Sequence, residues 1–142
     1  SGVGQLLIGR VGLEALDRAG WQPAALGGLT LGADPVAYAV AHAAAAAGRM
    51  LDAFTVRKEP KDHGTGRLIE GPLPDRADVV VVEDVVTTGA SALRAINAVR
   101  EAGGHVLGVL AVVERNPEGR HALSDAGFEL LALTTAQELL EG

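Results

Sequence analysis

Two adjacent acids, Glu83 and Asp84, follow four consecutive valines at 79–82 and precede a short polar segment at 87–91. The valine run predicts a strand that is buried on both faces of a parallel sheet. A carboxylate at the end of such a strand can bind two neighbouring sugar hydroxyls and stabilise positive charge that develops on a sugar ring. The alternative is a helix cap or a solvated strand end. We favour the functional interpretation because of the polar segment that follows.

The segment 87–91 reads Thr-Thr-Gly-Ala-Ser and predicts a phosphate-binding turn at the start of a helix. A helix amino terminus offers unpaired N–H groups and a positive dipole, and Gly89 lets the backbone approach a ligand closely. The Gly-Lys-Ser/Thr of a P-loop is absent from the chain, and the dinucleotide fingerprint is absent from this turn. An ordinary capped turn is the alternative. The acids and the turn together predict a phosphorylated sugar as the ligand.

A polar loop at 58–71, together with Arg57 just before it, is the second region with possible chemistry. It holds the chain's only two lysines although the net charge is −6, and its cations are Arg57, Lys58, Lys61, His63 and Arg67. This clustering predicts contact with an anion, such as a departing pyrophosphate, and His63 could donate a proton. The length and two glycines of the loop predict a lid that closes over the ligand. A solvated surface loop is the alternative.

Two other predicted strands are followed by residues that could also contact a ligand, although their sequence patterns are weaker signals. Arg115 comes after the apolar segment 106–113 and could bind a planar carboxylate with two hydrogen bonds, although a solvent-facing arginine is equally compatible. The segment 27–32 could offer amides to a second phosphate or simply form a tight turn. Three histidines lack metal-ligand spacing and are expected to be structural or surface residues: His42, His105 and His121.

The pattern along the chain predicts one α/β domain, residues 1–142, with an open, mainly parallel sheet flanked by helices. Helices are expected at 6–19, 36–47, 91–102, 117–126 and 135–140, and strands at 24–26, 51–57, 78–83, 106–113 and 129–133. The acidic balance argues against a general nucleic-acid-binding protein. No cysteine is present, and no apolar run reaches membrane-spanning length. We expect a cytoplasmic protein.

The segments together resemble the type I phosphoribosyltransferases. The two acids followed by Thr-Thr-Gly-Ala-Ser, within 79–91, resemble the superfamily signature for 5-phosphoribosyl 1-diphosphate (PRPP). The sequence Val-Arg-Lys-Glu-Pro-Lys-Asp-His-Gly at 56–64 resembles the mobile loop of the orotate phosphoribosyltransferase family. The segment 27–35 resembles a form of that family's first phosphate loop. The resemblance covers about residues 6–135.

The resemblance implies a glycosyltransferase (pentosyltransferase) of pyrimidine (UMP) biosynthesis. It would transfer phosphoribosyl from PRPP to orotate, giving orotidine 5′-monophosphate and pyrophosphate. It implies catalytic roles for Lys61, His63 and Asp84, and orotate contacts from Thr87 and Arg115. The residues implied to bind PRPP are Arg57, Lys58, Lys61, His63, Glu83, Asp84, Val85, Val86, Thr87, Thr88, Gly89, Ala90 and Ser91.

The resemblance also implies that Mg²⁺ is required, carried mainly by substrate oxygens and not by a protein metal site. It implies a homodimer in which the mobile loop, about 57–71, reaches across to the partner's site. No nucleic-acid or membrane partner is expected. Two other interpretations remain open: a type I phosphoribosyltransferase for another base, and a non-catalytic PRPP-binding regulator. A generic nucleotide-binding module would not account for the lysine-containing loop.

Three departures from the family pattern are visible. Family members usually begin with a segment in which a lysine and an aromatic pair lie against orotate. Nothing equivalent stands before residue 6, so we expect this amino-terminal segment to be absent from the chain. Many members have a lysine where Gly32 stands, and the first acid is often Asp where this chain has Glu83.

Overall fold

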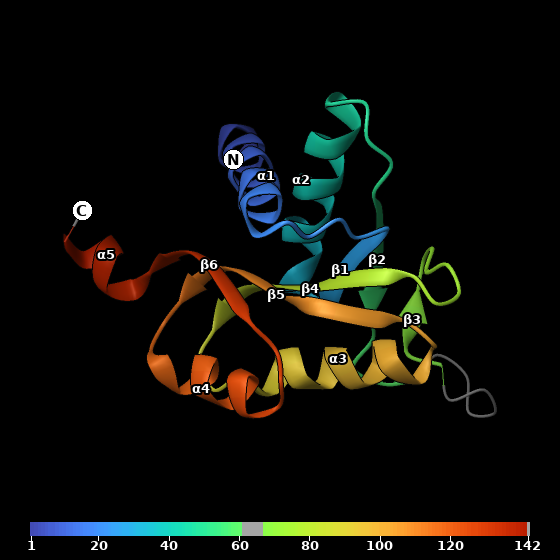
Figure 1. Ribbon diagram of the computed structural model, residues 1–142. Helices are drawn as coiled ribbons and strands as arrows, with labels where there is room; N and C mark the ends of the chain where they lie inside the picture. The colour runs from blue at the N-terminus through green and yellow to red at the C-terminus, as the bar shows by residue number, and fades with distance from the viewer. Residues whose placement is uncertain (61–66, 142) are drawn as a thin grey trace.

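A six-stranded sheet forms the centre of the computed structural model, which describes residues 1–60 and 67–141 (Figure 1). The strand order is β3-β2-β1-β4-β5-β6, and neighbouring strands are parallel except for the antiparallel pair β2 and β3. The strands are β1 Ala25–Leu29, β2 Asp52–Val56, β3 Ile69–Glu70, β4 Asp78–Val86, β5 His105–Glu114 and β6 Leu130–Thr135. The predicted open, mainly parallel sheet is confirmed.

Helices cover both faces of this sheet (Figure 1). They are α1 Gly2–Ala19, α2 Ala33–Ala46, α3 Ala90–Glu101, α4 Pro117–Asp125 and α5 Ala136–Glu141. Val80 and Val82 pack in one buried cluster with α1 and α2, whereas Val79 and Val81 pack in the other with α3. The four valines are fully buried, so the strand is buried on both faces as predicted.

The structure corrects two strand ends next to the predicted site. We expected β4 to stop at Glu83, but it continues to Val86 because these residues still pair with β5. We expected Gly27 and Gly28 to begin a turn, but both lie inside β1 and pair with β2. Neighbouring backbone leaves no room for a side chain at either glycine, so their small size serves close packing of strands.

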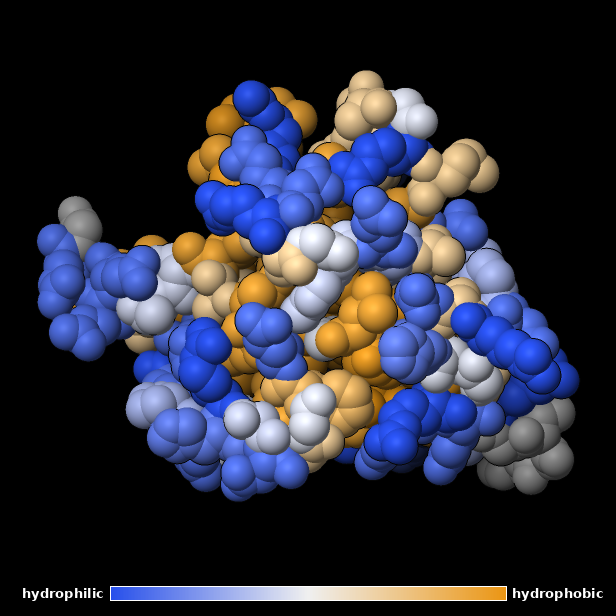
Figure 2. Space-filling model, in the orientation of Figure 1, coloured by the Kyte–Doolittle hydropathy of each residue, from blue (hydrophilic) through white to orange (hydrophobic). Residues whose placement is uncertain are grey.

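The remaining differences are at other boundaries. α1 begins at Gly2, four residues earlier than expected, where the Ser1 hydroxyl caps it by accepting a hydrogen bond from the Gly4 N–H at 3.1 Å. The short strand β3 falls in the segment that we predicted as loop. Part of the surface near α1 is hydrophobic in Figure 2, and Val3, Leu6 and Leu7 on this helix are exposed. In the described part of the chain, no helix is long and apolar enough to cross a membrane.

Candidate active site

The carboxyl ends of β1, β4 and β5 meet at one edge of the sheet because these strands are parallel neighbours. The Arg115 N–H donates to the carbonyl of Val86 at 2.9 Å, which places the turn after β5 beside the end of β4. The turn after β1 also lies there, since a Cβ atom added to Gly32 would stand 2.8 and 2.9 Å from the Asp84 carboxylate oxygens. The structure therefore brings together three of the segments that the sequence singled out.

Glu83 and Asp84 point to opposite sides of β4, as expected for neighbours in a strand. Glu83 is only 5% exposed, and its Oε1 atom has no hydrogen-bond partner among the described residues. Burial, with a smaller contribution from the charge of Asp84, raises the pKa of Glu83 to about 8. This carboxyl group therefore keeps its proton at neutral pH and can both donate and accept a hydrogen bond.

Asp84 has the opposite environment. It is exposed, and one carboxylate oxygen accepts a hydrogen bond from the Val85 N–H at 2.7 Å. Gly32 lies against the carboxylate, and the absence of a side chain there leaves space for it. Asp84 is thus the acid that an incoming ligand at the sheet edge can contact directly.

The segment 87–91 forms a small hollow at the amino terminus of α3. Its volume is about 100 Å³, and it is lined by Glu83 and by residues 85–92. Gly89 precedes the helix with a φ of 86°, a conformation that favours glycine, and it has no side-chain cap of its own. The first N–H groups of a helix point out of its end, so the hollow can accept an anion. The predicted turn thus lies at the start of a helix and lines a hollow, and its binding of phosphate stays a prediction.

Asp34 fixes the turn after β1, a role that we did not predict from the sequence. Its two carboxylate oxygens accept hydrogen bonds from the hydroxyls of Thr30, at 2.7 Å, and Thr55, at 3.1 Å. The Thr30 N–H also donates to the carbonyl of Val56 at 2.8 Å. An acid in the first turn of a helix, four residues after a threonine, was the available signal. These bonds hold residues 30–32 beside Asp84.

The chain is similar over most of its length to one enzyme family. An orotate phosphoribosyltransferase from Aquifex aeolicus (strain VF5) is 48% identical over 137 residues, which cover 96% of this chain and 74% of that protein. The chain belongs to the orotate phosphoribosyltransferase family. No family model matches the chain.

Two crystal structures of the Mycobacterium tuberculosis H37Rv orotate phosphoribosyltransferase have the same fold. The complex with inorganic phosphate aligns with a TM-score of 0.86 at 42% identity and covers 98% of this chain and 74% of that one. The complex with PRPP aligns with a TM-score of 0.82 at 43% identity and covers 95% of this chain and 75% of that one. The orotate phosphoribosyltransferase resemblance stated from sequence is therefore confirmed.

Two of the predicted cations, Arg57 and Lys58, follow directly after β2. The Arg57 guanidinium donates to Glu70 Oε1 at 2.8 Å and to the carbonyl of Glu59 at 3.2 Å, a pairing that we did not predict. Lys58 is exposed, and its carbonyl accepts from Arg94 of α3 at 3.0 Å. The predictions for Lys61 and His63 lie outside the described residues.

The three histidines outside the loop are not gathered at the site. His105 Nδ1 lies 2.9 Å from Asp78 Oδ1 at the amino ends of β5 and β4, and His42 and His121 are exposed. Among the residues described, no group of three or more His, Asp or Glu side chains could hold a metal ion. The candidate site of this orotate phosphoribosyltransferase family member is therefore the edge formed by Asp84, the hollow and the adjacent turns.

Proposed function

We propose that this protein catalyses the transfer of phosphoribosyl from PRPP to orotate, giving orotidine 5′-monophosphate and pyrophosphate in pyrimidine biosynthesis. The proposal rests on one observation: the exposed carboxylate of Asp84 lies at the same sheet edge as a small hollow, of about 100 Å³, lined by Glu83 and the segment 87–91. The family relationship supports it, because a relative that is 43% identical has a structure in complex with PRPP.

The reaction breaks the bond between the anomeric carbon and the diphosphate oxygen, and the electron pair leaves with pyrophosphate. A ring nitrogen of orotate forms the new bond to that carbon and releases its proton to the solvent. The sugar passes through a cation-like state, which a carboxylate near the ribose stabilises. We assign this role to Asp84, and we assign contacts with the ribose hydroxyls to both acids. Glu83, being protonated, could donate a hydrogen bond as well as accept one.

The 5′-phosphate would occupy the hollow at 87–91, which is lined by backbone N–H groups and by the hydroxyls of Thr87, Thr88 and Ser91. The Ala90 N–H, which donates to the Thr88 hydroxyl at 3.2 Å, would exchange this bond for one to the phosphate. Val85, Val86, Gly89 and Ala90 would contribute backbone to the same site. This placement sets the ribose of PRPP between the hollow and the two acids of β4. Thr87 would also lie close enough to contact orotate.

The diphosphate of PRPP would bind the cations that follow β2, namely Arg57, Lys58, Lys61 and His63. Lys61 and His63 would act on the leaving group, by stabilising its charge and by supplying a proton. Arg57 would have to exchange its ion pair with Glu70 for the diphosphate. Arg115, which is exposed directly after β5, would bind the carboxylate or carbonyl groups of orotate with its planar guanidinium.

Mg²⁺ is part of this proposal as a partner of the substrate. When bound, it would neutralise charge on the diphosphate and ribose oxygens. The donor set in the described part of the site fits this arrangement: Asp84 offers an accessible hard oxygen ligand, whereas Glu83 holds its proton. The protein residues therefore orient the substrate that carries the metal.

We also propose a cytoplasmic homodimer in which the loop at about 57–71 reaches the partner's site. Exposed apolar side chains on α1 support an interface between copies: Val3 is 78% exposed, and Leu6 and Leu7 are each 61% exposed. A groove between α1 and α2 with a volume of about 700 Å³ continues this surface. Light scattering coupled to size exclusion would measure the mass, and a monomer at micromolar concentration would contradict this part of the proposal.

One assay tests the central proposal. The protein is mixed with Mg²⁺, PRPP and a panel of bases, and both pyrophosphate release and the loss of orotate absorbance are followed. We expect turnover with orotate only. Turnover with another base would identify a different transferase. PRPP binding detected by calorimetry without pyrophosphate release from any base would identify a non-catalytic regulator.

A further inference from the structure

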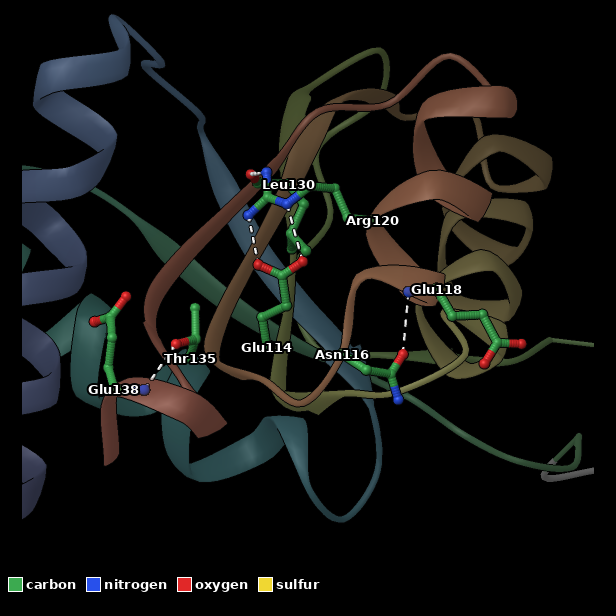
Figure 3. Close-up of polar contacts among 7 residues, drawn as sticks. All are labelled: Glu114, Asn116, Glu118, Arg120, Leu130, Thr135 and Glu138. Carbon is green, nitrogen blue, oxygen red and sulfur yellow. Dashed lines mark hydrogen bonds and ion pairs between the residues drawn. The ribbon is translucent and has the colours of Figure 1, made fainter. Parts of the chain in front are cut away.

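Arg120 and Glu114 form a two-pronged ion pair where β5 ends and α4 begins (Figure 3). Arg120 Nε donates to Glu114 Oε2 at 2.9 Å, and Arg120 Nη2 donates to Glu114 Oε1 at 2.8 Å. The third donor, Arg120 Nη1, binds the carbonyl of Leu130 at 2.8 Å. Glu114 is only 8% exposed, so the sheet holds its carboxylate firmly. Arg120 therefore joins α4 to both β5 and β6.

The connection between β5 and α4 has only two residues, Arg115 and Asn116. Asn116 caps α4 by accepting a hydrogen bond from the Glu118 N–H at 3.0 Å, and the Arg115 N–H is bound to the carbonyl of Val86. A connection of two residues is too short to absorb a movement of α4. A tilt of α4 would therefore move the backbone of Arg115. The ion pair that fixes α4 therefore also fixes the backbone from which Arg115 extends.

α4 also contacts the segment 87–91 that forms the hollow. A Cβ atom added to Gly119 would lie 2.9 Å from the Thr87 carbonyl oxygen and 3.2 Å from the Gly89 nitrogen. The first turn of α4 thus packs directly against the turn at 87–91, which we propose binds the 5′-phosphate. Gly119 and Arg120 are neighbours in this turn, so the contact with 87–91 and the Glu114–Arg120 pair fix the same end of α4.

We propose that Glu114 and Arg120 are positioning residues that hold Arg115 where it binds the base. This inference rests on the proposed function, in which Arg115 contacts orotate. The two residues do not touch the substrate themselves. They act by fixing α4 and the short connection before it, so their loss should weaken orotate binding more than PRPP binding.

The test is Arg120→Lys, which keeps the charge and the helix propensity but removes the two-pronged geometry. We expect the KM for orotate to rise about tenfold, while the KM for PRPP and kcat change much less, since a small misplacement of a binding group is costly. Glu114→Gln should shift the orotate KM in the same direction. Both are assayed at a temperature where their circular dichroism matches that of the wild type.

Arg49→Lys is the matched control. Arg49 also pairs with a carboxylate, at 2.9 Å from Asp17 Oδ1, but at the opposite end of the sheet from the candidate site. This variant should leave both KM values unchanged. A double variant, Arg115→Ala with Arg120→Lys, should bind orotate no more weakly than Arg115→Ala alone, because Arg120 acts through Arg115.

The outcomes separate the two proposals. A wild-type protein that releases no pyrophosphate with orotate overturns the proposed function, and this inference with it. Wild-type turnover of orotate combined with an unchanged orotate KM in Arg120→Lys and Glu114→Gln overturns the inference alone. A lower melting temperature with unchanged KM values would show that the pair only stabilises the fold. If the two substitutions weaken orotate binding additively in the double variant, Arg120 does not act through Arg115, which would also contradict the inference.

Discussion

Glu83 and Asp84 are neighbours in the chain, yet the fold makes them different chemical groups. Glu83 points from β4 toward the α3 side, is buried beside the hollow, and has a pKa raised to about 8. Asp84 points toward the turn after β1, is exposed, and lies against Gly32. One step along a strand reverses the face on which a side chain lies. Two adjacent acids in a sequence can therefore supply one neutral carboxyl group and one accessible carboxylate.

The largest expected effect is on the pH dependence of stability, through Glu83. Its folded-state pKa of about 8 exceeds its ordinary value of 4.5, so the contribution of this residue to stability is lost as pH rises from about 4.5 to about 8. The free energy of unfolding should fall by up to roughly 5 kcal/mol over this range, since each pH unit corresponds to about 1.4 kcal/mol.

Glu83→Gln should remove this loss because the amide does not titrate. Urea unfolding of the wild type and of the variant at pH 5, 6, 7 and 8 measures the difference between the two profiles. The two curves should diverge steadily above pH 5, with the variant relatively more stable at pH 8. Parallel curves would show that Glu83 is not the buried, protonated member of the pair.

The next effect concerns Asp84 and turnover. Asp84→Asn should lower kcat/KM by at least about tenfold, because the accessible carboxylate that offsets positive charge on the ribose becomes neutral. The melting temperature should change little, since this side chain is exposed. Pyrophosphate release gives the rate, and Asp125→Asn, at the exposed end of α4, is the control. Wild-type turnover in Asp84→Asn would contradict the role assigned to this acid.

The smallest effect is expected from Gly32. In Gly32→Ala the new Cβ atom would stand 2.8 and 2.9 Å from the Asp84 carboxylate oxygens, so the acid must shift. A displaced group loses part of its effect, and we expect kcat/KM to fall roughly threefold to tenfold. Gly2→Ala is the control, because nothing lies within 4 Å of a Cβ atom there. Unchanged kinetics in Gly32→Ala would mean that the position of Asp84 is not set by this contact.

Much of the fold could be predicted from local pattern. The four valines identified the buried strand β4, and the polar segment at 87–91 identified the start of α3, because burial and backbone freedom are encoded near each residue. The ends of β1 and β4 were less predictable. Gly27 and Gly28 have a turn-like composition, but the close approach of β2 on one side and β4 on the other keeps them in the sheet.

The candidate site shows the same division. The acids, the turn at 87–91 and Arg115 could be named from sequence because strand ends and helix starts carry local signals. The Arg57–Glu70 pair, the hydrogen bond from Thr55 to Asp34 and the Glu114–Arg120 pair could not. Each joins residues whose distance in space depends on how separate elements pack, and a single sequence does not display that distance.

The sequence by itself determined which chemical groups are present and the order of strands and helices that carries them to one edge of a parallel sheet. Only the tertiary structure decided which acid is buried, which arginine is already paired, and which helix backs the hollow. The physical reason is that protonation state and side-chain position depend on solvent exclusion and on contacts between distant segments. Those quantities exist only once the chain has folded.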